Sequence, residues 1–380
     1  MTTARRSLAA HVGQAFQPDE AADDAAISPS ATTPPEPSDD SVRLEGPTHA
    51  ERRQSLRAYF RRVRAASIEM CRPLDPEAFR VQPMEDVSPS WWNLGHTSWF
   101  FARNVLQTFG GATDPADAEF DYVLNSYYAA LGPRLGRVHR GSMTRPTTDE
   151  VFAYRTSVDE RMQRLIESID LDRWQEFERI VTIGINHEQQ HQELFYTEIK
   201  YILWQDPPRL RRAYRSAAPV EGSEPRPHSP DKIQFVPFDG GLFQFGGLEP
   251  GFCWDNELPV HRQFLQPFSL ADRLITNGEF REFIDDGSYQ EQLLWLDNGW
   301  NCARREDWQA PLYWERDGHY RRQWTLGGLV PLDPAAPVSH VSFYEADAFA
   351  RWKSATWSDD RGVVLPDERQ WEHAARAAAP

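Results

Sequence analysis

Apolar residues recur with a helical period in the first half of the chain. Between residues 51 and 71 (ERRQSLRAYFRRVRAASIEMC), large apolar side chains stand three or four positions apart, at Leu56, Tyr59, Phe60 and Val63. This spacing places them along one face of an amphipathic helix. The pattern therefore predicts a first helix in this stretch.

Two further helices are predicted from the residues that can open them. Ser88 and Pro89 offer an N-cap residue and a proline for the first helical turn, directly ahead of SWWNLGHTSWFFARNVLQTF. Thr147 or Thr148, with Glu150 close by, can open a helix in TTDEVFAYRTSVDERMQRLIESI.

A fourth helix is predicted from about Leu171 or Trp174 to Trp204, because an Asp-Pro-Pro sequence follows and stops it. A loop-rich stretch, 110–148, is the one long connection in this region. Four amphipathic helices with one long connection indicate a four-helix bundle over residues 48–210.

The pattern of apolar and turn-forming residues changes after the fourth helix. Residues 211–231 form a Pro-rich linker, and residues 232–380 contain short apolar segments separated by Gly, Pro and Asp, as in brief strands and loops. Two helices interrupt them, TNGEFREFIDDG and SFYEADAFARWKSATW, each opened by a Thr or Ser cap. We expect an α+β second domain. Residues 1–47, rich in Ala, Ser, Pro and Asp, are expected to form a disordered tail.

Composition narrows the possible partners. The formal net charge is −16, whereas binding to a nucleic-acid backbone needs a basic surface, so a nucleic-acid partner is not expected. A membrane partner is not expected either, since the sequence contains no run of about 18 apolar residues. The first twenty residues also lack the apolar core of a secretory signal, which predicts a cytoplasmic protein.

The strongest local signal for chemistry is a histidine pair in the fourth helix. His187 and His191 are four residues apart, so both imidazoles project from one helical face about one turn apart. The same face carries Ile180, Gly184, His187, His191, Leu194 and Ile202. A bundle helix would bury such a stripe, and buried imidazoles need a partner, for which a metal ion is the usual choice. The alternative is a pair of exposed or hydrogen-bonded histidines.

A third ligand must come from another helix. Glu193 is a poor candidate, because two positions beyond His191 is about 200° around the helix; it is expected to be an outer or surface residue. His96, in the aromatic run WNLGHTSWFF, is better placed, although a lone buried histidine can also be held by a backbone carbonyl. Three neutral imidazoles without a thiolate suit iron(II) with open coordination positions, while zinc, nickel and manganese remain open on chemistry alone.

Many segments, in one order, resemble a known family from about residue 50 onward. In the bundle these are WNLGHTSWFF, LNSYYAALGPRLGRVHRG and NHEQQHQELFYTEIKYIL. In the second domain they are FCWDNELPVHRQFL, ITNGEFREFIDDGSYQ, WLDNGW, PLYWE, PVSHVSFYEADAFARW and LPDERQWEHAAR. The chain resembles the ergothioneine-biosynthesis sulfoxide synthases. The resemblance implies a DinB-like four-helix bundle followed by a C-type-lectin-like domain of the formylglycine-generating-enzyme (sulfatase-modifying-factor) type.

The resemblance also implies roles for individual residues. His96, His187 and His191 match the three ligands of the iron ion, Fe(2+). Gln190 matches a residue near the imidazole of the histidine-type substrate. Arg137 and Arg140 match a pair that binds the carboxylates of the thiol substrate, and guanidinium groups three residues apart could fork onto a small acidic peptide. The alternative for both arginines is a solvated position in a loop.

The reaction that the resemblance implies joins sulfur to an imidazole. The small-molecule partners are N-trimethylhistidine (hercynine), a thiol such as γ-glutamylcysteine or cysteine, and O2, and the product is a sulfoxide. An ovothiol-type or selenoneine-type synthase is an alternative on the same scaffold. Because the family's second domain continues beyond Pro380, we expect this domain to be incomplete at its C-terminus. A proton-donor Tyr and an Asn-Trp pair of relatives then lie outside the chain, so an inactive, truncated metal-binding bundle is a further alternative.

Overall fold

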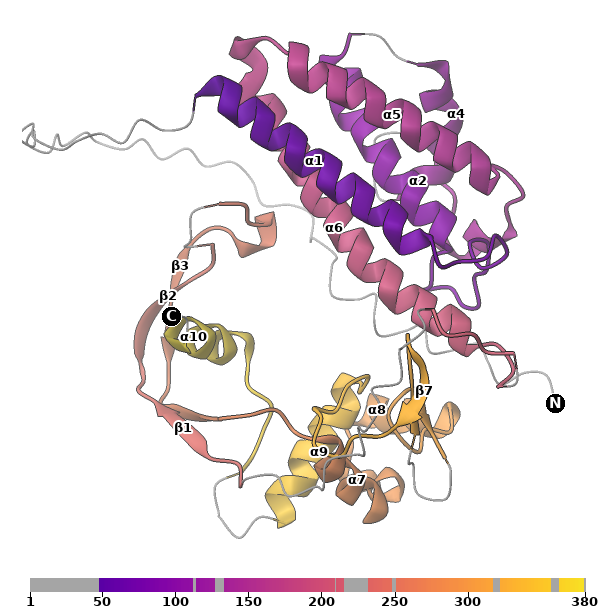
Figure 1. Cartoon of the computed structure of the whole chain (residues 1–380). Coiled ribbons are helices and arrows are strands. Elements are labelled where there is room, and N and C mark those ends of the chain that lie inside the picture. Colours follow the sequence, from indigo (N-terminus) through magenta and orange to yellow (C-terminus); the bar gives the residue numbers. More distant parts are fainter. Residues whose placement is uncertain are drawn as a thin grey trace, which may run out of the picture. The chain divides into compact units, whose positions relative to one another are not determined.

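The structure, a computed structural model, forms two compact units (Figure 1). It describes residues 48–111, 114–126, 133–208, 210–214, 232–247, 251–316, 322–356 and 362–378. One unit ends at Ile202 and the other begins at Leu203, and each is described by itself. The expected tail, 1–47, lies outside the described residues, as do residues 215–231 of the expected linker.

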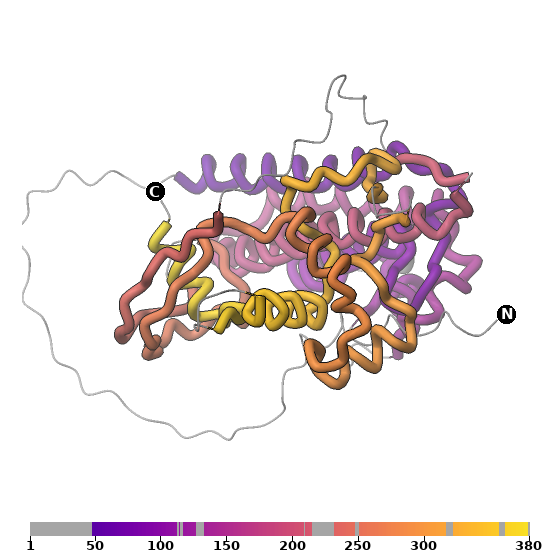
Figure 2. Tube along the Cα trace, turned by 90° about the horizontal axis from the view of Figure 1, so that it is seen from below, coloured from indigo at the N-terminus to yellow at the C-terminus, as the bar shows by residue number. Residues whose placement is uncertain are grey.

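The first unit is a bundle of four long helices, as the apolar pattern predicts (Figure 1). The long helices are α1 (His49–Cys71), α2 (Ser90–Phe101), α5 (Thr148–Ser168) and α6 (Trp174–Trp204). Shorter elements are η2 (Ala102–Leu106), α3 (Gln107–Phe109), α4 (Pro115–Leu124), η4 (Arg137–Ser142) and η5 (Leu171–Arg173). In the second view, α1 again runs alongside the other bundle helices (Figure 2). The long connection lies between α2 and α5 and contains α4.

Capping side chains open α1 and α5, whereas α2 begins without one. The Thr147 side chain accepts a hydrogen bond from the Glu150 amide, and the Glu150 carboxylate accepts one from the Thr147 amide, so α5 opens as predicted. The prediction that Ser88 caps α2 is wrong. Pro89 holds the N-cap position without a side-chain hydrogen bond, because Ser88 is engaged by Glu198 and Arg140 instead.

Helix α2 is the centre of the bundle, since all twelve of its residues are buried. The helix continues through η2, a stretch of π-helix that widens one turn, into α3. Phe101 packs edge-to-face on Phe60 of α1 with ring centres 5.1 Å apart. Gly184 of α6 lies so close that an added Cβ would stand 2.6 Å from Phe101 and 2.8 Å from Phe100. A glycine is therefore required where α6 crosses α2.

The buried stripe of α6 differs from the predicted one. Its buried members are Trp174, Phe177, Val181, Gly184, Ile185, Glu188, Phe195, Glu198, Ile199 and Ile202. Leu194, which was expected in the stripe, is 41% exposed. Because the stripe is centred on Gly184, Glu188 and Phe195, the face of His187, His191 and Leu194 lies at its edge.

The second unit combines small antiparallel sheets with helices, which confirms the expected α+β class. Strand β1 (Phe235–Phe238) pairs with β4 (Phe268–Ala271), and β2 (Gly241–Phe245) pairs with β3 (His261–Leu265). A third sheet has the order β5 (Trp314–Glu315), β6 (Arg322–Thr325), β7 (Gly328–Pro331). The helical elements are η6 (Asp255–Glu257), α7 (Asn277–Asp285), η7 (Ser288–Gln290), η8 (Gln292–Leu294), α8 (Asp297–Arg305), α9 (Phe343–Thr356) and α10 (Glu368–Ala378).

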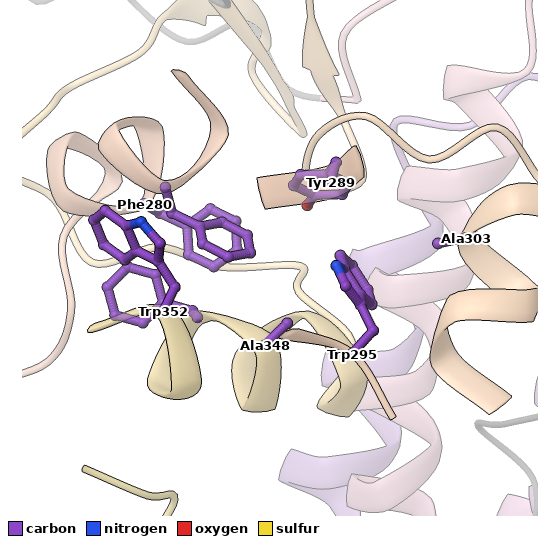
Figure 3. Close-up of a cluster of buried hydrophobic side chains, with 8 residues drawn as sticks. Phe280, Tyr289, Trp295, Ala303, Ala348 and Trp352 are labelled. Atoms are coloured by element: carbon purple, nitrogen blue, oxygen red, sulfur yellow. The ribbon is translucent and has the colours of Figure 1, made fainter. Parts of the chain in front are cut away.

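An aromatic cluster forms the core of this unit (Figure 3). Its buried members are Phe280, Phe283, Tyr289, Trp295, Ala303, Ala348, Phe349 and Trp352. The two helices that supply most of them, α7 and α9, begin at the predicted caps, Thr276 and Ser342. Thr276 forms a capping box with Glu279, so a short-range signal in the sequence fixes where an aromatic helix enters the core.

Candidate metal centre

Helices α2 and α6 bring the three predicted histidines together. Each of His96, His187 and His191 offers one nitrogen, and these atoms all lie within 4.8 Å of one another. The ring centres are 5.0 Å apart for His96 and His187, 4.9 Å for His96 and His191, and 4.7 Å for His187 and His191. Three nitrogen ligands at this spacing can converge on a single ion.

Hydrogen bonds fix which nitrogen two of these rings present. The Nδ1 atom of His96 lies 2.6 Å from the carbonyl oxygen of Leu124, which can only accept, so Nδ1 carries the proton. The Nδ1 atom of His191 lies 2.9 Å from Oδ1 of Asn93 and donates to it in the same way. In both rings Nε2 keeps its lone pair, which is the arrangement that metal-binding histidines need.

The environment of His187 and the protonation states of all three imidazoles also suit metal binding. Among the described residues, the buried Nδ1 atom of His187 has no hydrogen-bond partner. Burial lowers the pKa of His187 to about 4, and burial together with the neighbouring histidines holds the pKa of His96 and of His191 well below the usual range. All three imidazoles are therefore neutral at pH 7, as ligands must be. These residues fit a divalent transition-metal ion.

Aromatic rings surround the cluster and restrain it. Trp92 stacks on His96 with ring centres 4.5 Å apart and planes 12° apart, and Trp99 stacks at 5.7 Å. Phe100 lies 5.0 Å from His187. His96 is 3% exposed, whereas His187 and His191 are half-buried at the edge of the α6 stripe. The histidine cluster is thus buried on the α2 side and closer to the surface on the α6 side.

A buried carboxylate next to His187 balances two buried arginines. Glu188 is bonded to Arg64 with a distance of 2.7 Å, to Arg155, and to the Ser67 hydroxyl at 2.5 Å. Burial alone would raise the pKa of Glu188, but Arg155 and Arg64 outweigh it and hold this pKa at about 2. The network joins α1, α5 and α6, and Arg64 extends it to Ser98 of α2. Sequence reasoning missed it, although a Glu on the same helical face as Gly184 and Phe195 was a signal.

A second chain of hydrogen bonds supports His191. Sequence patterns did not predict this chain either. Asn93, which accepts from His191, donates through Nδ2 to Glu198 at 2.5 Å. The other oxygen of Glu198 accepts from the Ser88 amide at 2.9 Å, and the Ser88 hydroxyl accepts from Arg140 at 2.8 Å. Burial raises the pKa of Glu198 to about 7, although Ser88, Asn93 and Arg140 act in the opposite direction.

The remaining predicted residues differ in how they are placed. Arg140 is buried, with its guanidinium 3.3 Å from the centre of the Trp92 ring, so it is not a solvated loop residue. Arg137 forms an ion pair with Asp86 at 3.6 Å and keeps 35% of its side chain exposed. Gln190 and Glu193 are exposed on α6, and Glu193 is not part of the histidine cluster.

Comparisons with known proteins agree with this architecture. Residues 59–195 match the model of the DinB superfamily, and residues 220–379 match that of the sulfatase-modifying factor enzyme 1-like domain. The chain is 30% identical over 299 residues to a hercynine oxygenase from Mycolicibacterium thermoresistibile, in a match that covers 76% of this chain and 58% of the relative. It is 33% identical over 192 residues to the hercynine oxygenase of Mycolicibacterium smegmatis, covering 50% of this chain and 40% of the relative.

The second unit also has relatives of its own. A formylglycine-generating enzyme from Streptomyces coelicolor is 27% identical over 181 residues, which cover 43% of this chain and 54% of that enzyme. The chain thus pairs a DinB-type bundle with a sulfatase-modifying-factor domain. The resemblance to the ergothioneine-biosynthesis sulfoxide synthases is confirmed, and the chain spans 40% to 58% of the length of the two hercynine oxygenases.

Proposed function

We propose that this chain, which pairs the two domains of the sulfoxide synthases, supports iron(II)- and O2-dependent C–S bond formation between N-trimethylhistidine and a thiol. One observation carries the proposal: three neutral imidazoles converge within 4.8 Å on α2 and α6. The names of the hercynine oxygenase relatives support the choice of imidazole substrate and of oxygen as the oxidant. The thiol is γ-glutamylcysteine or cysteine.

His96, His187 and His191 would hold the iron. Three nitrogen ligands and no thiolate suit iron(II), and they leave coordination positions for small molecules. Iron(II), when bound, supplies the redox chemistry that couples oxygen to the thiol. In the overall reaction, the C2–H of the imidazole, the S–H of the thiol and one O2 give a C–S bond, an S=O bond and one water. Oxygen takes up the four electrons that leave carbon and sulfur.

The chain's own residues would organise the reactants around this centre. Gln190 is exposed on α6 between the two histidine ligands, so its amide can bind the imidazole substrate. Arg137, partly exposed beside Asp86, is suited to a carboxylate of the thiol. Arg140 contacts Trp92 and Ser88, so it would support the carboxylate site from within. Holding both substrates at one centre replaces an improbable encounter by one organised geometry.

The partners in this proposal are small molecules alone. The net charge of −16 disfavours a nucleic-acid surface. Within the described residues, no helix is both long and apolar enough to cross a lipid bilayer. We place the reaction in the cytoplasm, where thiol substrates are kept reduced.

An oxygen-uptake assay tests the proposal. The full chain, loaded with Fe(II) under argon, is mixed with trimethylhistidine, the thiol and oxygen, and the sulfoxide is identified by mass spectrometry. We expect oxygen uptake that requires both substrates and that is lost in the His96→Ala variant. Metal binding without thiol-dependent uptake would overturn the proposed reaction and leave a metal-binding bundle. Competition between γ-glutamylcysteine and cysteine identifies the preferred donor.

A further inference from the structure

The ligand His191 differs from the other two in what holds its second nitrogen. His96 donates to a backbone carbonyl, that of Leu124, whose position is fixed by the fold. The buried Nδ1 of His187 has no hydrogen-bond partner among the described residues. His191 donates to a side chain, Oδ1 of Asn93, at 2.9 Å. Its orientation therefore depends on how that amide is held.

Glu198 determines which end of the Asn93 amide faces His191. Both carboxylate oxygens of Glu198 accept hydrogen bonds, one from the Ser88 amide at 2.9 Å and one from Nδ2 of Asn93 at 2.5 Å. The NH2 group of Asn93 is thereby directed to Glu198, and its oxygen is left for His191. A reversed amide would place its NH2 group against the Nδ1–H of His191 and its oxygen against the Glu198 carboxylate, so both bonds would be lost.

Burial makes this arrangement rigid. Asn93 is 4% exposed and Glu198 is 9% exposed, so neither has bulk water as an alternative partner. Ser88 is buried as well, and its hydroxyl accepts from Arg140 at 2.8 Å, which ties the chain of bonds to the segment that precedes α5. Each polar atom in the chain has one geometry that satisfies its neighbours.

We propose that Asn93 and Glu198 are a positioning pair that fixes the tautomer and ring orientation of His191 for metal binding. The inference rests on the proposed function, because it assumes that His191 is a ligand. Neither residue touches the reacting atoms. Their role is to keep Nδ1 of His191 protonated and its Nε2 directed toward the ion, as the outer partners of metal-binding histidines do.

Exchange of the two side chains gives the sharpest test. In Glu198→Gln, one amide oxygen faces two donors, so the new NH2 group opposes either Nδ2 of Asn93 or the Ser88 amide. In Asn93→Asp, the two carboxylates face each other. In the double variant Asn93→Asp/Glu198→Gln, the new glutamine accepts from Ser88 and donates to the new aspartate, which still accepts from His191. The double variant keeps the charge and restores every bond.

One further variant removes the Asn93 amide altogether, and two control variants change similar side chains elsewhere in the bundle. Asn93→Leu removes the amide and keeps a side chain that branches at Cγ. Alanine is less suitable, because a cavity of about 20 Å³ adjoins Asn93 and the truncated site could admit a water in its place. The matched controls are Asn104→Leu, whose Nδ2 donates to the Phe100 carbonyl, and Glu193→Gln, on the exposed face of α6.

The measurements are the Fe(II) dissociation constant, from anaerobic competition with a chelator, and the visible spectrum of the Co(II)-loaded full chain. We expect the three single variants to bind Fe(II) roughly 10- to 100-fold more weakly than wild type and to show an altered Co(II) spectrum. The double variant should regain at least about tenfold of affinity over either of its single parents. The two controls should bind as wild type does.

Three outcomes would contradict these claims. If wild type binds Fe(II) and the single variants bind equally well with an unchanged spectrum, the positioning role is wrong and the proposed function stands. Weak binding by both single parents without recovery in a folded double variant also overturns the pair. If wild type itself does not bind Fe(II), the proposed function fails, and the inference fails with it.

Discussion

Buried charge beside the candidate metal centre is balanced at Glu188, whose carboxylate contacts both Arg64 and Arg155. All three side chains are at most 3% exposed. A buried carboxylate with two arginine partners is stable only as a set, because each member would otherwise lose its hydration without replacement. Glu188 directly follows His187 on α6, so the integrity of the set affects both the stability of the bundle and the position of that histidine.

Glu188→Gln should therefore destabilise the bundle by about 3 to 5 kcal/mol, since it removes the carboxylate that pairs with buried Arg155 and leaves Arg64 with Asp159 alone. Hydrogen exchange of the α6 amides reports the free energy of opening of this unit separately from that of the second unit. The matched control is Glu193→Gln, the same change at an exposed position of the same helix. Equal protection in the two variants would contradict the role of Glu188.

The pH dependence of bundle stability should reveal the titration of the Glu198 carboxyl group. Its pKa is raised to about 7 by burial, from a usual value of 4.5. A raised pKa means that the folded state binds the proton more tightly than the unfolded state. The resulting stabilisation is complete below pH 4.5 and is lost as the pH rises through 7.

Between pH 5 and 8, this loss amounts to about 2 to 3 kcal/mol of bundle stability. The Glu198→Gln variant has no proton to lose, so its stability should fall by that much less over the same range. The measurement is α6 hydrogen exchange in both proteins, corrected at each pH for the intrinsic exchange rate. Parallel pH profiles would show that Glu198 does not titrate in this range.

At the residue scale, the sequence predicts ligands better than their supports. His187 and His191 are recognisable because a spacing of four residues places two side chains on the same face of a helix. No short-range pattern identifies Asn93 and Glu198, since their partners lie about a hundred residues away along the chain. The burial of Arg140 was equally invisible, because it depends on Trp92 lying beneath the guanidinium.

At the element scale, the crossing of α2 and α6 determines whether three histidines can meet. His96 comes from α2 and the other two candidate ligands come from α6, so the distance between the helices sets the size of the site. Gly184, one turn before His187, allows the close approach. A Cβ at this position would stand 2.6 Å from Phe101 and 2.8 Å from Phe100.

Gly184→Ala should weaken both the fold and the metal site. Overpacking costs about 1 to 3 kcal/mol, which exceeds or offsets the gain of about 1 kcal/mol from the better helix propensity of alanine. Relief of the contact moves α6 away from α2, so Fe(II) affinity should fall. Gly136→Ala is the control, since an added Cβ there meets nothing nearer than 3.6 Å. Unchanged Fe(II) affinity in Gly184→Ala would contradict this view of the crossing.

Local signals predicted the helices well and the sheets poorly. Caps such as Thr147 and Thr276 act within three residues, so the sequence contains the whole interaction. Ser88 failed as a predicted cap because a distant residue, Glu198, competes for it. In the second unit, β1 pairs with β4 while β2 pairs with β3. Such nested pairing depends on contacts between distant segments, which short-range patterns do not contain.

At the scale of the whole molecule, the two units have separate cores. The bundle is centred on α2, and the second unit is centred on the aromatic cluster of α7 and α9 (Figure 3). The candidate metal centre lies entirely within the bundle. Iron should therefore stabilise the two units unequally.

Fe(II) at 100 times its dissociation constant should stabilise the bundle by about 2.7 kcal/mol. Hydrogen exchange should slow in α2 and α6, with little change in α7 and α9, and removal of the metal by a chelator should reverse the effect. The His191→Ala variant serves as the control. Protection that is spread evenly over both units, or that persists in this variant, would place the metal elsewhere.

The central claim is that His96, His187 and His191 form one iron(II) site, and the most direct test is an anaerobic Fe(II) titration of the full chain. Equilibrium dialysis with elemental analysis gives the number of ions bound and their dissociation constant, for wild type and for the three single His→Ala variants. The account predicts one Fe(II) per chain in wild type and strongly weakened binding in each variant. Equal binding by wild type and all three variants, or no binding by wild type, would contradict it.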